Sequence, residues 1–141
     1  MNSAFDELCS LAREASLTES IEAMLGWDER TYLPAAAGEY RAEQMTFLTG
    51  LAHQKRTDKR LGDLLGELAD SDLAKNVHSD AGATIRELKR QYDKRVKLPQ
   101  SLVEELTRAS VLGQQAWVKA RQDNDFAQFA PHVEKLYRLK R

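Results

Sequence analysis

Apolar side chains recur at helical spacing along most of this chain, and that pattern constrains the fold more than any other feature. The clearest example is a series of leucines on one predicted face, Leu61, Leu64, Leu65 and Leu68. No stretch alternates apolar and polar residues for long enough to predict a strand. The sequence therefore predicts an all-α fold of six or seven helices, arranged up and down as an antiparallel array with short turns.

Capping signals and prolines predict where the first helices begin and end. Asn2 or Ser3 opens the first helix, and the run Ser-Leu-Thr-Glu at 16–19 has the form of a capping box that would restart it. Pro34 ends the second helix, because the residue before a proline avoids helical geometry. A third helix is expected over 38–55.

The remaining segments predict four more helices. The leucine series starts after Thr57-Asp58, a long helix covers 72–97, the next runs from Pro99 to about 122, and the last begins at Pro131. Inward-facing residues are predicted to be Val77, Ala81, Ile85, Leu88, Tyr92 and Val96 in the long helix, and Leu102, Val103, Leu106, Ala109, Trp117, Phe126, Phe129, Val133, Leu136 and Tyr137 beyond it. The last helix reaches Arg141 without a glycine stop or a cap, so we expect a sequence cut within a helix.

Composition narrows the class of protein. At 141 residues, the chain (1–141) is expected to form a single helical domain. Lys and Arg number 21 against 22 Asp and Glu, a balance that argues against nucleic acid as a partner. One cysteine, Cys9, excludes an internal disulfide. No apolar run approaches the roughly 18 residues of a membrane span, and no signal peptide is recognisable, so we expect a cytoplasmic protein without a membrane partner.

The three histidines do not have the spacing of a zinc peptidase. Such a site on a helix needs His-Glu-x-x-His, which places two imidazoles one turn apart beside a carboxylate that activates water. His53, His78 and His132 are each followed by other residues and lie far apart in the sequence. We therefore predict no catalytic and no metal-binding residue in this chain, although a site assembled from distant helices stays open.

Other candidate groups have both a structural and a functional interpretation. Cys9 lies on the apolar side of the first helix, where a small core residue is expected. The acidic pairs Asp28-Glu29, Glu104-Glu105 and Asp123 with Asp125 are typical of solvated helix faces.

Asp28 is the exception among these carboxylates, because it falls in line with Leu25 on the inward face. A buried carboxylate needs a partner, which Arg41 or the Trp27 indole could supply. The pair would then be either a structural lock or a polar group that lines a groove.

The segment 86–97 carries six basic residues and two acidic ones. It reads as a solvated helix face or as a surface that steers acidic partners, without the interleaved aromatics of a nucleic-acid binder.

Two dense blocks of residues resemble a known family. Residues 27–34 contain Trp27, Asp28, Thr31 and Pro34 at the spacing of a Trp-Asp-x-x-Thr-x-Met-Pro stretch, with Leu33 in place of methionine. Further matches follow in order: Arg41-Ala42-Glu43-Gln44, Leu51-Ala52-His53, Leu98-Pro99 with Leu102-Val103, Trp117, Ala120-Arg121, Asn124-Asp125-Phe126, Phe129 and Pro131. Together they resemble the N-terminal region of the carboxypeptidase Taq family of zinc-dependent metallocarboxypeptidases.

This resemblance implies a part of an all-helical, usually homodimeric enzyme that removes C-terminal residues from peptides. The N-terminal helices of such an enzyme form a wall and lid over a deep groove. Its zinc-binding His-Glu-x-x-His and downstream Glu lie beyond the region that matches here. The resemblance thus implies that this chain has no cofactor of its own and is inactive alone. Zinc and peptide substrate would be bound only in a full enzyme, and the substrate-binding residues of this chain are unknown.

Three functions follow from these observations. The first is the wall and lid of a peptidase, whose partner is the rest of the enzyme or another copy bound through uncovered apolar helix faces. The second is a free-standing helical interaction module that exposes the same faces. The third is a complete small zinc hydrolase that uses His53, His78 or His132.

Overall fold

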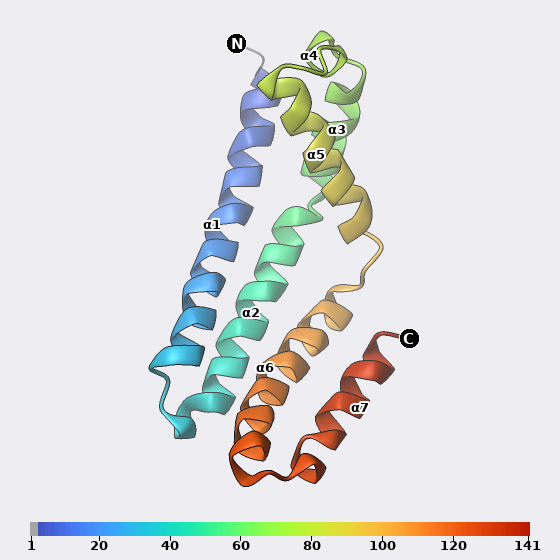
Figure 1. Cartoon of the computed structure of the whole chain (residues 1–141). Coiled ribbons are helices and arrows are strands. Elements are labelled where there is room, and N and C mark those ends of the chain that lie inside the picture. The colour runs from blue at the N-terminus through green and yellow to red at the C-terminus, as the bar shows by residue number, and fades with distance from the viewer. Residues whose placement is uncertain (1–2) are drawn as a thin grey trace. The chain divides into compact units, whose positions relative to one another are not determined.

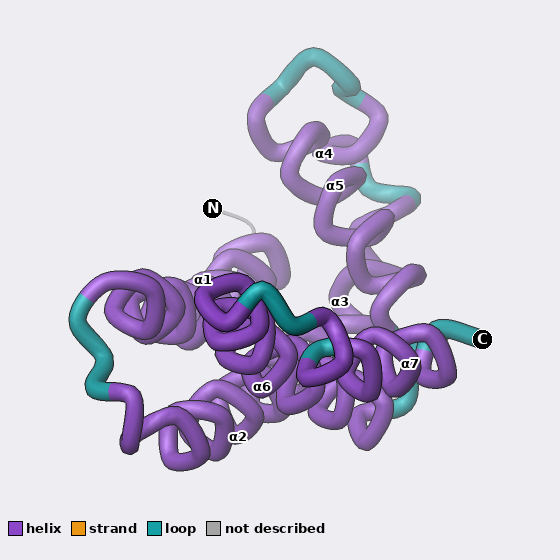
Figure 2. Tube along the Cα trace, turned by 60° about the horizontal axis from the view of Figure 1, so that its bottom comes forward, coloured by secondary structure: helices purple, strands orange, loops and turns teal. Residues whose placement is uncertain are grey.

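The computed structural model describes residues 3–141, and every regular element in that range is helical. The α-helices are α1 (Ser3–Thr31), α2 (Gly38–Arg56), α3 (Lys59–Ala69), α4 (Asp72–Lys75), α5 (Asp80–Arg95), α6 (Gln100–Asp123) and α7 (Ala130–Leu139) (Figure 1). Two short 3-10 helices, η1 (Ala35–Ala37) and η2 (Phe126–Gln128), precede α2 and α7. Within the described range no strand occurs, as the tube in Figure 2 shows, so the all-α prediction is confirmed.

The chain divides into two compact units. Unit 1 contains Met1–Thr18 and Leu51–Pro99, and unit 2 contains Glu19–Gly50 and Gln100–Arg141. Both α1 and α2 contribute one end to each unit, so the units share two continuous helices. The prediction of a single domain stays a prediction.

Unit 1 has a core of large apolar side chains built on the leucine series. Leu61, Leu64, Leu65 and Leu68 of α3 are each at most 2% exposed and pack with Leu8 of α1 and Ile85 of α5. The Asp58 carboxylate caps α3 by accepting from the Arg60 N–H at 2.7 Å, as the Thr57-Asp58 signal predicted. The sequence pattern was sufficient here because one strongly amphipathic helix determines the core.

Unit 2 is packed in a different way, through small residues. Its buried residues are Gly38, Arg41, Ala42, Gly50, Ala109, Val111, Gly113 and Ala120. The α1 and α2 segments run antiparallel, because Glu22 bonds to Thr49 while Asp28 bonds to Arg41. A glycine leaves room between α2 and α6: a Cβ on Gly50 would lie 2.3 Å from the present position of Glu104 Oε1.

The predicted restart at 16–19 is wrong, because α1 is continuous from Ser3 to Thr31. The hydroxyl groups of the supposed capping box have other partners. Thr18 Oγ1 donates to the Glu14 carbonyl one turn earlier at 3.1 Å, and Ser16 Oγ accepts from Arg56 Nη2 at 2.8 Å. Of the two predicted openings, Ser3 is the first residue of α1, and Asn2 lies outside the described residues.

The predicted long helix over 72–97 is also wrong, because it is interrupted between α4 and α5. Ser79 begins α5 by accepting from the Gly82 N–H at 3.1 Å, and its hydroxyl donates to the Asn76 carbonyl at 2.8 Å. Val77 and Val96, predicted to face inward, are 53% and 46% exposed, whereas Ile85 is buried.

Several large apolar residues of unit 2 lie at the surface where burial was predicted. Trp117 is 44% exposed, Phe126 is 68% exposed and Tyr137 is 71% exposed. Phe129 is half-buried and meets the Phe126 ring edge-to-face. The turn at Asn124 is as predicted, and this asparagine has a φ of 52°, in the left-handed region that asparagine tolerates.

Candidate functional site

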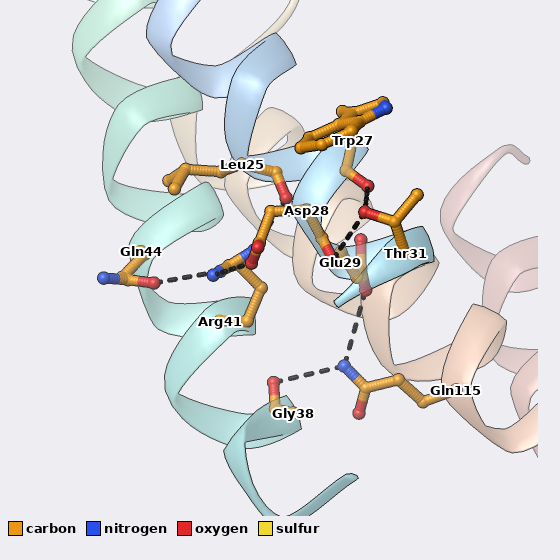
Figure 3. A network of polar contacts seen from close by, with 9 residues as sticks. All are labelled: Leu25, Trp27, Asp28, Glu29, Thr31, Gly38, Arg41, Gln44 and Gln115. Carbon is orange, nitrogen blue, oxygen red and sulfur yellow. Dashed lines mark hydrogen bonds and ion pairs between the residues drawn. The ribbon is translucent and has the colours of Figure 1, made fainter. Parts of the chain in front are cut away.

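The strongest polar network of unit 2 is centred on Arg41 of α2. Its guanidinium donates from Nη2 to Asp28 Oδ2 at 2.7 Å, from Nη1 to the Leu25 carbonyl at 2.7 Å, and from Nε to Gln44 Oε1 at 3.0 Å (Figure 3). Arg41 is only 8% exposed, so its charge depends on these oxygens in place of water. Of the two partners predicted for Asp28, Arg41 is the one that binds its carboxylate.

The same aspartate also ends α1. Its backbone carbonyl accepts from the N–H groups of Tyr32 at 2.9 Å and Leu33 at 3.0 Å, just before Pro34 starts η1. Thr31 Oγ1 donates to the Trp27 carbonyl at 2.9 Å and so satisfies another C-terminal acceptor of the helix. The side chain and the main chain of Asp28 thus fix the end of α1 and its attachment to α2.

A glutamine from α6 connects this corner to a third helix. Gln115 Nε2 donates to the Gly38 carbonyl at 3.2 Å and lies 3.4 Å from Glu29 Oε1. A Cβ on Gly38 would lie 2.2 Å from Gln115 Oε1, so a larger residue here would displace the Gln115 amide from this position. Figure 3 shows Gln115 reaching from α6 toward Glu29 and Gly38.

Aromatic side chains lie on the outside of this corner. The Trp27 and Tyr32 rings meet edge-to-face with centroids 5.6 Å apart, and these residues are 61% and 74% exposed. The Trp27 indole is therefore not the partner of Asp28, the alternative left open by the sequence. The Arg41 network holds the backbone that carries both rings.

The chemistry of this network is that of a fixed ion pair. Arg41 is committed to three oxygens of its own unit, and Gln115 closes the connection to α6. Sequence reasoning identified Asp28 and Arg41 but missed Gln115, which is 86 positions from Glu29 and carries no local signal.

The histidines do not converge. His53 is buried and its Nε2 lies 3.0 Å from the Leu98 carbonyl, His78 is exposed between α4 and α5, and His132 lies on α7 beside Gly113. Among residues 3–141, no three His, Cys, Asp or Glu side chains are grouped so that they could hold a metal ion. The side chains present therefore do not fit a zinc site, and the predicted lack of metal and catalytic residues stays a prediction.

The cysteine and the acidic pair before η2 both have a structural explanation. Cys9 is half-buried, and burial together with the nearby Asp6 carboxylate raises the pKa of its thiol, which disfavours the reactive thiolate. Asp123 and Asp125 both accept from Gln128 Nε2 at 3.1 Å, so this acidic pair organises the turn before η2.

The second acidic pair is divided between two partners. Glu104 accepts from Gln100 Nε2 at 2.6 Å, whereas Glu105 pairs with Lys135 of α7 at 3.4 Å. The two carboxylates therefore do not act as one acid and base couple in this structure.

The basic segment of α5 is partly neutralised along its own helix. Lys89 pairs with Asp93 at 2.9 Å, and Arg90 donates to both Glu87 oxygens at 2.8 and 2.6 Å. Arg90 and Gln91 hold the pKa of Glu87 at about 2. This surface therefore has the paired charges of a solvated helix.

A sequence profile of one family matches almost the whole chain. It is described as the carboxypeptidase Taq (M32) metallopeptidase family, and it matches residues 7–141. The chain belongs to this family. The resemblance predicted from the two blocks of residues is thereby confirmed.

Two curated relatives give the extent of the similarity. Thermostable carboxypeptidase 1 of Thermus thermophilus is 34% identical over 136 residues, which is 96% of this chain and 27% of the relative. Carboxypeptidase 1 of Bacillus subtilis is 26% identical over 132 residues, which is 92% of this chain and 26% of the relative. The chain therefore spans about a quarter of the length of the curated relatives it matches.

Solved structures share the fold. The crystal structure of a protein called BsuCP superposes with a TM-score of 0.89 at 24% identity and covers 98% of this chain and 27% of that one. The structure of a protein called CHT matches with a TM-score of 0.69 at 32% identity and the same coverage. In this M32 chain, none of the helices within residues 3–141 is long and apolar enough to span a bilayer.

Proposed function

We propose that this chain supplies N-terminal helices of the wall and lid over the substrate groove of a zinc metallocarboxypeptidase. The main support is the family match over residues 7–141. In addition, the chain spans only about a quarter of the length of relatives named carboxypeptidases. The full enzyme would release C-terminal residues from peptides. The single cysteine suits a reducing compartment, and we propose the cytoplasm.

By this proposal the chain is inactive on its own. A metallopeptidase cleaves an amide with water activated by a metal that keeps an open coordination position. Within residues 3–141 the histidines do not provide the ligands for such a metal. The Nε2 atom of His53 lies at the Leu98 carbonyl, and the other two histidines lie on separate segments. Zinc would instead be held by residues of the full enzyme outside this segment.

The Arg41 network supports a role in shaping the groove. A wall or lid helps catalysis by enclosing the substrate and excluding water, which requires helices held at fixed positions. Arg41 fixes the end of α1 against α2, and Gln115 ties the start of α2 to α6. Proposed partners are accordingly the remainder of the peptidase, a peptide substrate in the full enzyme, and a second copy of that enzyme.

The proposal is tested by a peptide-release assay on the pure chain with added zinc or cobalt. We expect no release of C-terminal residues from an N-blocked peptide by the chain alone. Metal-dependent release by the chain, lost on replacing His53, His78 or His132, would overturn the proposal and support a small complete hydrolase.

The second candidate, a free-standing interaction module, is favoured by the exposed apolar residues of unit 2, such as Met24 at 71% and Phe47 at 71%. The two functions differ in what the apolar residues bind. The module requires a partner other than an M32 peptidase, whereas the groove wall requires the peptidase itself.

A further inference from the structure

The apolar residues of unit 2 are distributed in an unusual way. Its buried residues are Gly, Ala and Val apart from Arg41, whereas five large apolar side chains of its α1 and α2 segments are more than half exposed. These are Ile21 (51%), Met24 (71%), Trp27 (61%), Tyr40 (66%) and Phe47 (71%), and we call them the outer face. The four largest fully buried side chains among residues 3–141 all belong to unit 1.

The α1 part of the outer face is left largely uncovered by the neighbouring helices, because Ile21, Met24 and Trp27 are each more than half exposed. Glu22 bonds to Thr49 of α2 and Glu29 reaches Gln115 of α6, so these carboxylates mark the inner side of α1. Met24 and Trp27 each lie two residues from one of them, which is about 200° round the helix. Asp28, one turn from Met24, bonds to Arg41 at the edge of this side and still leaves Met24 71% exposed.

The α2 part of the outer face also lies away from the neighbouring helices. Arg41 contacts α1, and Glu39 accepts from Arg108 of α6 at 2.7 Å. Tyr40 lies between them in sequence, about 100° round the helix from each, and Phe47 is two turns further along the same side. The side of α2 that carries these two rings therefore contacts neither α1 nor α6.

The pattern of α1 and α2 indicates what kind of partner covers this face. Apolar residues are spread around both helices almost evenly, in contrast to the one-sided pattern of α3. A helix whose apolar residues are not gathered on one side presents apolar side chains to neighbours on more than one side. The BsuCP structure contains the same fold as only 27% of its chain, so most of that protein is available to cover these helices.

We propose that the outer face is the surface on which the remaining three quarters of an M32 peptidase packs. This inference rests on the proposed function and adds to it the residues that make the contact. The occupant is thus a helical protein body with a complementary apolar surface, and neither a second copy of this chain nor a free peptide.

The test is co-expression of the tagged chain with the part of the Thermus thermophilus relative that lies beyond the matching region. We expect this remainder to co-purify with the unsubstituted chain. Phe47→Lys and Ile21→Lys each place a charge in the contact and should reduce its recovery about tenfold or more. Tyr137→Lys, at an equally exposed position of α7 (71%), should leave the recovery unchanged.

Every outcome decides the inference. Circular dichroism and thermal unfolding of each isolated variant confirm that lost recovery does not reflect an unfolded chain, since lysine is a good helix former at an exposed position. Failure of the remainder to co-purify, or equal recovery with all three variants, overturns the proposal. So does sedimentation showing that the outer face only mediates self-association.

The activity of the complex separates this inference from the proposed function. If the complex forms through the outer face but releases no C-terminal residues with zinc, the proposed function is contradicted. The assignment of the outer face as the packing surface is then supported. If the complex is active and forms equally well with Phe47→Lys and Ile21→Lys, the proposed function is supported. The assignment of the outer face as the packing surface is then contradicted.

Discussion

The guanidinium of Arg41 and the carboxylate of Asp28 form an unequal pair: their atoms lie 2.7 Å apart, but the Arg41 side chain is 10% exposed and that of Asp28 is 37% exposed. The cation therefore depends on its partner more than the anion does, because water can still reach Asp28. Removing the negative charge leaves a buried positive charge without a counter-ion, which is a costly arrangement.

Asp28→Asn should therefore lower the free energy of unfolding by about 1–3 kcal/mol in the natural chain. In an Arg41→Met background the same change should cost much less, because the buried charge is gone. Urea unfolding of the four proteins measures this coupling.

A cycle on the exposed pair Lys59–Asp63, whose side chains are 88% and 53% exposed, serves as the control. Its coupling should be much smaller, because exposed pairs are screened by water. Equal coupling in the two cycles would contradict the structural role assigned to Arg41.

A second prediction concerns the interruption between α4 and α5. Gly82→Ala should destabilise the chain by about 1–3 kcal/mol, because its Cβ would lie 2.3 Å from the Asn76 carbonyl oxygen, a backbone atom. Gly66→Ala on α3 is the matched control: apart from its chain neighbours and the backbone of its own helix, no atom lies within 4 Å of its Cβ position. That variant should gain about 0.5–1 kcal/mol of unfolding free energy, and equal effects of both substitutions would show that the turn is not closely packed.

The sequence predicted structure correctly where the residues that determine a helix lie within that helix. The leucine series of α3 was sufficient to predict its buried side, and Asp58 was sufficient to predict its start. The position of Asp28 on the inward face predicted a partner, either Arg41 or the Trp27 indole, and the structure shows that it is Arg41. In each case the deciding interaction lies on one helix or between neighbouring helices.

The errors have two physical causes. Hydroxyl groups that match a capping pattern, such as those of Ser16 and Thr18, were used for other hydrogen bonds, and the true cap at Ser79 was overlooked. The predicted burial of Trp117 and Tyr137 assumed that the chain covers all of its own apolar residues. That assumption does not hold in unit 2, where packing depends on glycine and alanine.

Glu87 provides a prediction on pH. Its pKa is held at about 2 by Arg90 and Gln91, below the ordinary value of a glutamate, so the ionised form stabilises the folded state above the unfolded pKa. This contribution should be lost as the pH falls from the ordinary glutamate range toward 2. NMR titration of the Glu87 carboxyl carbon measures the midpoint, and Arg90→Gln should raise it; an unchanged midpoint would show that Arg90 is not the cause.

The last prediction concerns the single thiol. Burial raises the pKa of Cys9 and the Asp6 carboxylate raises it further, so its thiolate fraction at neutral pH is small and alkylation by iodoacetamide should be slow. Asp6→Asn removes the smaller of the two causes and should accelerate alkylation modestly, with the pH–rate profile moved to lower pH. Chain unfolded in urea should react fastest, since desolvation by burial is then lost as well. A folded chain that reacts as fast as the unfolded one, or a pH–rate profile that does not respond to Asp6→Asn, would contradict the half-buried environment that the structure gives to Cys9.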